Sequence, residues 1–312
     1  MLHAGADFMN DIKEVSKREI VLVSPVAKSQ IVNNIRKILT RYLTKISGYW
    51  VKFYLRDCVK DREETYVVIV FDSPIWLNNI KTIQRFFPNS KIIVWYWNTI
   101  KCETLLNKVK KTSVPVYTFD KKDAQTHSIK LNTQFHWLKK ESQYSSGITY
   151  DAVFIGRTKD RLKLIENVYS SLTKAGLNVY FHVVKDNINY KSEIITLQTK
   201  YLRYHEALEI VRVSRVIIDL NSIGQTGLSL RPLEAIFLQK KLVTNCVALR
   251  EYSQESNDNV YYLSDNFEQD QDELINFMRK KFDDSIAISP DQFFVDSWLD
   301  NFIVPDNDQQ ST

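Results

Sequence analysis

Two polar segments of the sequence combine glycine and arginine at the ends of apolar runs. One is Gly156 to Lys159, with Arg161 two residues further on, and the other is Asn221 to Glu234. The longer segment contains Gly224 and Gly227, which have no side chain to keep the backbone away from a bound anion. A guanidinium can bind two phosphate oxygens at once. These residue types predict a site for a phosphorylated ligand.

Each segment stands between an expected strand and an expected helix. The strands are Tyr150–Ile155 and Val216–Leu220, and in open sheets of parallel strands ligands bind outside the carboxyl ends. The following helices begin with N–H groups that lack helical partners, and Pro232 suits the first turn because its missing N–H costs nothing there. We predict a phosphate cradle without a Walker loop, with Glu234 near the mouth of a cleft. The alternative, that the two arginines are surface residues of a helix start, stays open.

Apolar runs alternate with amphipathic segments along the chain, which is typical of parallel sheets covered by helices on both faces. The expected strands are Glu19–Pro25, Thr65–Phe71, Lys91–Trp97, Val114–Phe119, Tyr150–Ile155, Val179–Val184, Val216–Leu220 and Lys241–Asn245. The expected helices are Gln30–Leu43, Leu77–Phe87, Lys159–Ala175, Tyr204–Ser214, Pro232–Gln239 and Asp291–Phe302, and a further apolar segment covers Tyr49–Leu55. We predict an α/β protein with two Rossmann-like domains of mainly parallel strands.

A polar stretch with serine and glycine, Lys139 to Gly147, interrupts this alternation and suits an interdomain linker. We predict a first domain over residues 1–145, a second over 146–290, and a C-terminal helix and tail over 291–312.

Lys and Arg outnumber Asp and Glu by 24 to 12 in residues 1–140, and are outnumbered 18 to 25 in residues 141–312. The basic half suits nucleic acid, anionic lipid or a phosphorylated substrate, unless it is solvated surface without a partner.

Several classes of protein lack support in the sequence. It has no Walker motif, no dinucleotide fingerprint, no secretory h-region, and no apolar run near the roughly 20 residues of a membrane-spanning helix. Cys58, Cys102 and Cys246 are odd in number and far apart, which argues against a disulfide framework or a zinc site. The acidic pairs Asp270-Gln-Asp272 and Asp306-Asn-Asp308 occur in a helix start and a tail, where acidic residues are common. We expect no metal and no other cofactor.

Four segments of the second half resemble the donor site of glycosyltransferases with the GT-B fold. They are Ile217–Ala235, Lys240–Thr244, Tyr204–Arg215 and Phe154–Arg157. In the first half the resemblance rests on Asp72-Ser-Pro74 and Pro88–Asn98. More narrowly, the chain resembles bacterial enzymes of lipopolysaccharide-core, capsular-polysaccharide and exopolysaccharide biosynthesis, near the group with CgeB-like C-terminal domains. The resemblance implies two Rossmann-like domains that face a central cleft, one for a nucleotide-activated sugar and one for the acceptor.

The resemblance also implies roles for individual residues. Glu234 matches the glutamate that hydrogen-bonds the nucleotide ribose, and the other implied donor-binding positions are Gly156, Arg157, Arg161, His205, Gln225, Thr226, Gly227 and Arg231. Among retaining members with an E-x7-E motif, a glutamate lies eight residues before the ribose-binding one, whereas this chain has Thr226 there. The stereochemical outcome therefore does not carry over. Preorganised amides and arginines stabilise the charge that develops as the sugar–phosphate bond breaks, so such a site needs no metal.

An acceptor hydroxyl must also lose a proton, normally to a carboxylate or imidazole. Asp72 directly follows an apolar strand, where a base facing the cleft would lie, and Asn98 at the end of the next strand would meet the acceptor. An equally good interpretation makes Asp72 the start of a turn before the next helix. His127 and His136 are weaker candidates, and we expect His205 to line the nucleobase or sugar pocket.

The resemblance implies a metal-independent glycosyltransferase of hexosyl type, which moves a sugar from a nucleotide-sugar donor to a lipid-linked or surface-glycan acceptor. We expect it in the cytoplasm, held to the inner face of the cell membrane by basic residues of its first half: Arg36, Lys37, Arg41, Lys45, Lys52 and Arg56. No helix-turn-helix, zinc-finger or RNP pattern supports nucleic-acid binding. A non-catalytic binding or regulatory subunit and a sugar-nucleotide epimerase of the same fold stay open as alternatives.

Overall fold

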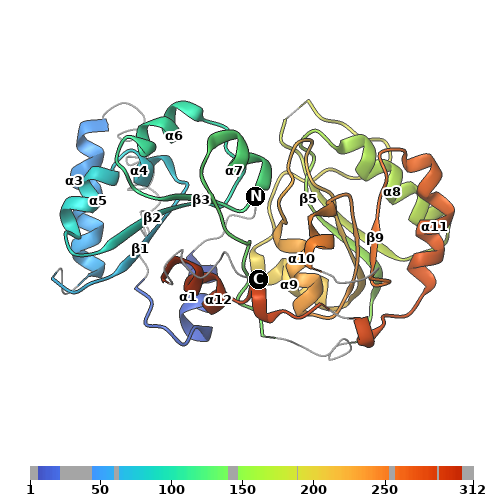
Figure 1. The fold of residues 1–312 in the computed structure, drawn as a ribbon. Helices are drawn as coiled ribbons and strands as arrows, with labels where there is room; N and C mark the ends of the chain where they lie inside the picture. The colour runs from blue at the N-terminus through green and yellow to red at the C-terminus, as the bar shows by residue number, and fades with distance from the viewer. Residues whose placement is uncertain are drawn as a thin grey trace. The chain divides into compact units, whose positions relative to one another are not determined.

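The computed structural model describes residues 6–21, 44–59, 63–139, 147–187, 189–252, 257–286 and 288–303 (Figure 1). The chain divides into two compact units. One comprises Met1–Phe8 and Gln134–Val295, and we call it the C-terminal unit. The other comprises Met9–Thr133 and Asp296–Thr312, and we call it the N-terminal unit. The short helix α1 (Ala6–Val15) includes the first boundary.

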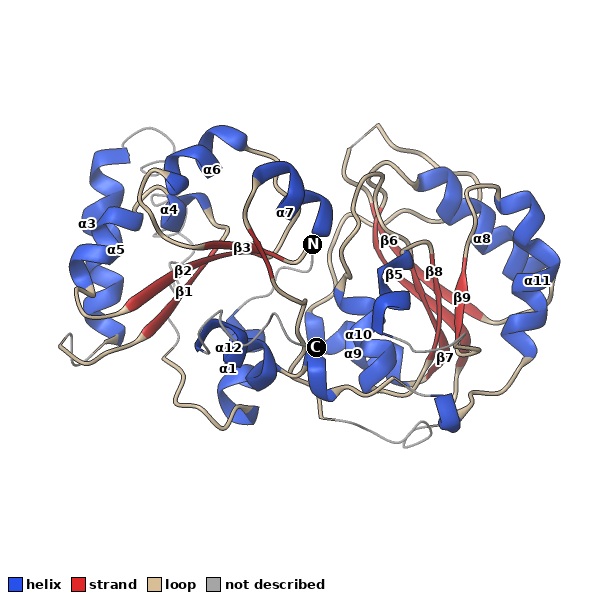
Figure 2. Cartoon of the chain, viewed as in Figure 1, coloured by secondary structure: helices blue, strands red, loops and turns tan. Residues whose placement is uncertain are grey.

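The C-terminal unit is built on a sheet of five parallel strands in the order β6-β5-β7-β8-β9. The strands are β5 (Tyr150–Arg157), β6 (Val179–Val184), β7 (Ser214–Asp219), β8 (Lys241–Thr244) and β9 (Val260–Tyr262). The helices are α8 (Leu162–Lys174), α9 (Tyr204–Arg212), α10 (Leu230–Phe237) and α11 (Phe267–Arg279), with 3-10 turns at Val247–Tyr252, Asp284–Ile286 and Asp291–Phe293. Helices α8 and α11 cover one face of the sheet, and α9 and α10 cover the other (Figure 2).

The central strands of this sheet carry apolar side chains on both faces, because helices bury both faces. Ile217 and Ile218 point to opposite faces of β7, and each is at most 1% exposed. Ile217 pairs in register with Val153 of β5 and with Leu242 of β8. A parallel sheet places all its carboxyl ends along one edge, so the segments after β5, β7 and β8 meet there.

The N-terminal unit has a sheet of four parallel strands in the order β1-β2-β3-β4. The strands are β1 (Val67–Phe71), β2 (Lys91–Tyr96), β3 (Val116–Thr118) and β4 (Lys130–Leu131). Helix α3 (Thr44–Cys58) precedes β1, and the helices that follow β1 are α4 (Pro74–Leu77), α5 (Ile80–Phe86), α6 (Glu103–Lys110) and α7 (Lys121–His127). The last helix of the chain, α12 (Val295–Ile303), returns to this unit.

Aromatic side chains dock α12 on the four-stranded sheet. The Trp298 ring lies edge-on to Trp95 of β2, with 5.3 Å between ring centroids, and Phe302 packs against Trp95 and against Tyr117 of β3. The Lys91 ammonium donates to the backbone carbonyl of Phe302 at 2.6 Å, which caps the carboxyl end of the helix. The end of the chain thus forms part of the core of the N-terminal unit.

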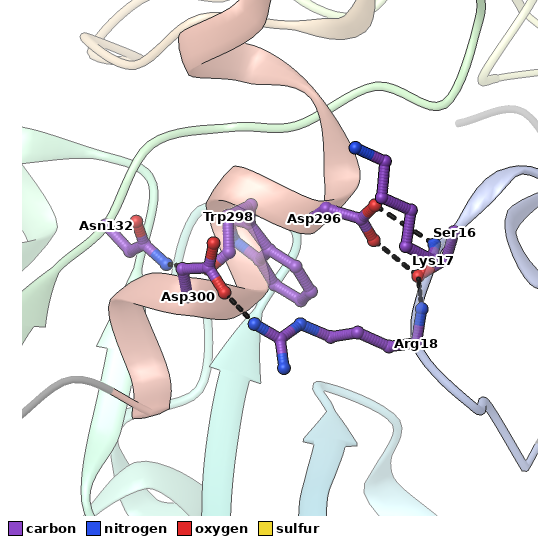
Figure 3. Close-up of polar contacts among 7 residues, drawn as sticks. All are labelled: Ser16, Lys17, Arg18, Asn132, Asp296, Trp298 and Asp300. Carbon is purple, nitrogen blue, oxygen red and sulfur yellow. Dashed lines mark hydrogen bonds and ion pairs between the residues drawn. The ribbon is translucent and has the colours of Figure 1, made fainter.

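A segment near the start of the chain holds the solvent side of α12 (Figure 3). Asp296 accepts hydrogen bonds from the Ser16 hydroxyl and from the Lys17 backbone N–H, the latter at 3.0 Å. Arg18 forms an ion pair with Asp300 one turn later. These contacts join residues about 280 positions apart in the sequence.

The predicted fold class is confirmed: two Rossmann-like α/β units each contain a parallel sheet. The unit boundaries differ from those we predicted: Phe135 and Trp137, which we placed in the first domain, are buried in the C-terminal unit, and α12 joins the N-terminal unit. Tyr49–Leu55 lies inside helix α3, since Val51 and Leu55 are buried four residues apart. The helix expected over Gln30–Leu43 and most of the strand expected over Glu19–Pro25 lie outside the described residues.

Candidate functional site

A buried carboxylate, Asp219, lies at the carboxyl end of β7. It is 4% exposed, and it accepts hydrogen bonds from the Ser229 hydroxyl at 2.7 Å and the Thr244 hydroxyl at 3.2 Å. Burial raises its pKa, while these hydrogen bonds and the charges of Arg161 and Arg231 pull it back down. Asp219 therefore links the ends of β7 and β8 to two arginines that come from different elements.

Helix α10 adds a buried ion pair to the same edge. Arg231 is 8% exposed and its guanidinium contacts the carboxylate of Glu234, which is fully buried. Burial raises the pKa of Glu234, and the charge of Arg231 opposes that rise. The pair joins residues one helical turn apart, so it fixes the first turn of α10 beneath the polar loop that precedes it.

A histidine and a tyrosine continue this network into the core. His136 Nε2 lies 2.9 Å from the Tyr204 hydroxyl, and Tyr204 in turn hydrogen-bonds the carboxylate of Glu234. The other ring nitrogen of His136, Nδ1, accepts the backbone N–H groups of Trp137 and Leu138 at 2.9 and 3.0 Å. Burial and the charge of Arg231 lower the pKa of His136 to about 3, so the ring is neutral at physiological pH.

Three polar atoms at this edge are buried without a hydrogen-bond partner. They are Arg161 Nε, Ser222 Oγ and Glu234 Oε1, and they are the only such side-chain atoms found in the described part of the C-terminal unit. Unpaired buried polar atoms are rare in folded proteins because each loses its hydrogen bonds to water. Their gathering at one edge of the sheet indicates a place where a polar ligand completes the bonding.

The loop between β7 and α10 is held in one shape by its own side chains. The Asn221 backbone N–H donates to Asn245 Oδ1 at 2.6 Å, and the Gln225 amide donates to Asn221 Oδ1 and to the Gly227 carbonyl. Gly224 has a φ of 82°, a conformation that glycine adopts without strain. The hydrogen bonds of Gln225 therefore hold the loop in this conformation, whereas Thr226 at its tip is exposed.

The first turn of α10 offers fewer backbone donors than the sequence suggested. Pro232 does lie in this turn, as predicted, but it has no N–H to give. The Ser229 hydroxyl already accepts the Arg231 backbone N–H at 3.2 Å. Among the first three helical residues only Leu230 keeps an N–H outside this capping, so an anion here would rely on the arginines and the loop.

The two arginines at the end of β5 and in the loop after it, Arg157 and Arg161, have different partners. Arg157 forms an ion pair with Asp186, which also accepts the Lys159 backbone N–H at 2.6 Å. Arg161 lies over the Phe154 ring, 5.7 Å from its centroid. A Cβ atom on Gly156 would come within 2.9 Å of that ring and 3.3 Å of Arg161, so the glycine makes room for the guanidinium. Arg161 thus belongs to the Asp219 cluster, and Arg157 is engaged by Asp186.

Two expectations about exposure are corrected. We expected Glu234 near the mouth of a cleft, but its side chain is shut off from solvent by packing around the Arg231 pair. We expected His205 to line a pocket, but it is exposed on α9 beside the buried Tyr204. The residue before it, Tyr204, hydrogen-bonds Glu234 of the charged cluster.

The two acceptor candidates of the N-terminal unit come together at the carboxyl edge of its sheet. The backbone N–H and the side-chain amide of Asn98 donate to Asp72 Oδ2 at 3.1 and 3.0 Å. Burial raises the pKa of Asp72 against the opposing effect of these hydrogen bonds. Burial and the charge of Asp72 raise the pKa of Tyr96 to about 12. The turn at Asp72 also opens a helix, since α4 begins at Pro74.

Acidic residues elsewhere have structural partners. Asp270 accepts the Ser264 backbone N–H and hydroxyl at 2.8 and 2.9 Å, which ties the start of α11 to the end of β9, and Asp306-Asn-Asp308 lies outside the described residues. Within the described ranges, no group of three or more His, Cys, Asp or Glu side chains could hold a metal ion. No helix in the described part of the chain is long and apolar enough to cross a membrane.

Comparisons of the chain with protein families, curated proteins and solved structures give a match only among solved structures. No protein-family model and no curated protein matches the chain. Among solved structures, the chain is similar to one described as the DNA modifying enzyme β-glucosyltransferase in the presence and absence of the substrate uridine diphosphoglucose. The match covers 75% of this chain and 79% of that chain, with 14% sequence identity and a TM-score of 0.41.

Sequence reasoning missed three members of the buried cluster: Asp219, Tyr204 and Ser229. Asp219 carried a signal, because a carboxylate at the carboxyl end of an otherwise apolar strand is costly unless it is paired. Ser229 carried another, because serine precedes a helix that begins one residue later. His136 was weighed as a proton acceptor, and its two backbone donors show that its Nδ1 is already occupied.

The low pKa of His136 gives a testable dependence of stability on pH. In the unfolded chain the ring binds a proton below about pH 6.5, whereas in the folded chain it does so only near pH 3. The unfolded state therefore binds more protons between these values, and stability falls as the pH drops, by at most about 1.4 kcal/mol per pH unit. Urea unfolding followed by hydrogen exchange in peptides of β5 measures this between pH 7 and 5.

His136→Asn is the matched control, because its amide oxygen can accept the Trp137 and Leu138 N–H groups but does not titrate. The carboxylates contribute to the pH dependence of both proteins, so the difference between them isolates the ring. Equal pH slopes for wild type and variant would show that His136 does not stay neutral in the fold.

Proposed function

We propose that the protein transfers a sugar from a nucleotide-sugar donor to an acceptor hydroxyl, and that the cluster around Asp219 and Glu234 binds the donor. The observation that carries this proposal is the gathering of the unpartnered atoms Arg161 Nε, Ser222 Oγ and Glu234 Oε1 at one carboxyl edge. A nucleoside diphosphate offers the complementary groups: a ribose diol that donates to a carboxylate, and phosphates that accept from a guanidinium.

The charge of the cluster suits the chemistry of the reaction. Cleavage of the sugar–phosphate bond leaves a nucleoside diphosphate, and fixed positive groups stabilise its negative charge as it develops. Arg161 is the nearest such group, and Arg231 becomes a second one if the incoming diphosphate draws it away from Glu234. That exchange would also open the carboxylate to the ribose. Both arginines keep their charge throughout, so this design uses no metal.

The acceptor side of the proposal assigns Asp72 as the base. Asn98 holds Oδ2 of this carboxylate with two hydrogen bonds, which fixes its orientation toward a substrate hydroxyl. Burial raises the pKa of Asp72, and a higher pKa makes a carboxylate a better proton acceptor as long as it stays ionised. We propose a lipid-linked or surface glycan as the acceptor and a hexose as the transferred sugar.

Thermal unfolding in the presence of UDP, GDP, CDP and ADP in turn tests donor binding. A nucleotide at about 100 times its dissociation constant adds roughly 2.7 kcal/mol, which moves the melting temperature of a chain of this size by several degrees. We expect one nucleotide to shift the wild type and to shift Glu234→Gln much less. Glu268→Gln, on the exposed start of α11, is the control and should respond like the wild type. No shift with any nucleotide would contradict the donor site.

Product analysis separates the remaining alternatives. A sugar-nucleotide epimerase would convert the donor without an acceptor, whereas a glycosyltransferase releases the nucleoside diphosphate only as the sugar moves to acceptor or water. A non-catalytic subunit would bind the nucleotide but would neither convert the donor nor transfer its sugar. Release of diphosphate that depends on a glycan acceptor and is lost in Asp72→Asn is the result that supports transfer.

Helix α3 supports the proposed contact with an anionic membrane surface. Tyr49 and Phe53 are 76% and 66% exposed, and the basic residues Lys52 and Arg56 are exposed on the same face, because positions 49, 52, 53 and 56 follow helical spacing. Aromatic rings at the headgroup level beside basic side chains are typical of helices that lie on anionic lipid. The opposite face of α3 is anchored, since Val51 is fully buried.

Co-sedimentation with vesicles of phosphatidylglycerol and phosphatidylcholine tests this surface. We expect binding that falls as salt rises, because the attraction of Lys52 and Arg56 is screened. The paired variant Phe53→Ser and Lys52→Ser should bind much less, while Lys101→Ser, an exposed lysine elsewhere in this unit, should bind like the wild type. Equal binding to vesicles of phosphatidylcholine alone would contradict an electrostatic contact.

A further inference from the structure

The hydrogen positions around His136 follow from its neighbours. Nδ1 accepts two backbone N–H groups, so it carries no proton. The ring is neutral, and its single proton must therefore lie on Nε2. Nε2–H then donates to the Tyr204 oxygen, 2.9 Å away.

This direction fixes the hydroxyl of Tyr204. Its oxygen is occupied as an acceptor, so its own proton points to the remaining partner, the carboxylate of Glu234. Burial and the nearby carboxylate raise the pKa of Tyr204 well above its usual value, so the hydroxyl keeps its proton. The chain of donors therefore runs from His136 through Tyr204 to Glu234 in one direction only.

We infer that Tyr204, oriented by His136, is a positioning residue that holds Glu234 for the ribose hydroxyls of the donor. The inference rests on the proposed function and adds two residues to it. In the structure Glu234 also contacts Arg231, and that contact weakens when the guanidinium turns to the diphosphate. Tyr204 and His136 come from the core and do not face the ligand, so they keep the carboxylate in place after Arg231 leaves.

The same hydrogen bonds determine which oxygen of the Glu234 carboxylate has no donor. Glu234 Oε2 takes the contact with Arg231, and Oε1 is left without a donor. A carboxylate held by a hydrogen bond on one side cannot rotate to exchange its two oxygens without losing that bond. The ribose therefore meets an acceptor with a fixed orientation.

Isothermal titration with paired ligands tests the inference. The probes are the nucleoside diphosphate that stabilises the wild type and its 2′,3′-dideoxy form, which lacks the ribose diol. We expect the wild type to prefer the complete ligand by at least about tenfold, the worth of one hydrogen bond to a charged group. In Tyr204→Phe the preference should shrink to about twofold, while affinity for the dideoxy ligand stays the same.

A second pair of variants tests the role of His136. His136→Gln keeps a side-chain N–H for the Tyr204 oxygen and should retain much of the preference, whereas His136→Leu has none and should lose it. Circular dichroism and the melting temperature establish that each variant is folded. Tyr204→Phe keeps the ring that packs against Trp137 at 5.1 Å, so it removes only the hydroxyl.

The outcomes separate this inference from the proposed function. Equal weakening of both ligands in Tyr204→Phe would mean a general structural role and would overturn the inference, although the donor site would stand. An undiminished preference in the same variant would overturn it as well. If the wild type binds no nucleoside diphosphate, the proposed function fails first, and the inference fails with it.

Discussion

Trp298→Ala should lower the free energy of unfolding of the N-terminal unit by about 3 to 5 kcal/mol. This is the usual cost of deleting a large aromatic side chain from a core that cannot collapse around the cavity. Trp298 is 2% exposed, and its ring packs edge-on against both Trp95 and Phe302, at 5.3 and 4.8 Å between centroids. Its loss should weaken the docking of α12, because Phe302 is then the remaining aromatic contact of the helix with β2 and β3.

Two further variants in the same helix control for this effect. Ile303→Ala removes a side chain that is 42% exposed and should cost much less. Trp298→Phe keeps an aromatic ring and deletes an indole N–H that has no partner, so it should also cost less than the alanine. Hydrogen exchange in peptides of β2 and β3, read against urea concentration, measures each value. Equal stability of Trp298→Ala and Ile303→Ala would show that α12 does not dock through this ring.

Arg231→Leu should destabilise the C-terminal unit by about 3 to 5 kcal/mol at pH 8. The reason is that Glu234, fully buried, would lose its countercharge. The loss should shrink as the pH falls, because burial already raises the pKa of Glu234 and protonation removes the unpaired charge. Urea unfolding at pH 8 and pH 5, followed in peptides of β7, measures both effects.

The double variant Arg231→Leu with Glu234→Leu separates the pair from its parts. It leaves no unpaired charge, so it should be considerably more stable than Arg231→Leu alone. Glu209 and Arg212 of α9 provide a matched pair with the same spacing, and there the glutamate is 69% exposed. Loss of that arginine should cost far less, because water replaces the lost partner. A double variant as unstable as the single one would show that packing, not charge, sets the cost.

Much of the fold could be predicted from local sequence because the relevant signals are local. Residues Val216, Ile217 and Ile218 are consecutive apolar residues, which predicts a strand buried on both faces. Pro232 predicts the first turn of a helix, and the structure has it in the first turn of α10. The segment Tyr49–Leu55 shows the limit of this reasoning, since its burial follows a helical period that a short apolar run does not reveal.

The candidate site could be located from the sequence but not assembled from it. Glycines and arginines at or after the ends of β5 and β7 point to this edge, because the carboxyl ends of parallel strands always share one edge. The partners of each side chain could not be read in the same way. Arg157 pairs with Asp186, whereas Arg161 lies over Phe154 and interacts electrostatically with Asp219, although both arginines stand in one short segment. His136 and Tyr204, 68 positions apart, meet behind Glu234.

The sequence by itself determined that there are two α/β units, the strands of their parallel sheets other than β4 and β9, and the polar loops at the strand ends. Hydrophobic periodicity and turn residues act over a few positions, so a single chain displays them directly. Only the tertiary structure decided that Glu234 is buried and that Asp72 pairs with Asn98. It also decided that Trp298 packs on Trp95, which stands about 200 positions earlier in the sequence. Burial, ion pairing and pKa depend on neighbours in space. Those neighbours are brought together only when the helices pack on the sheets.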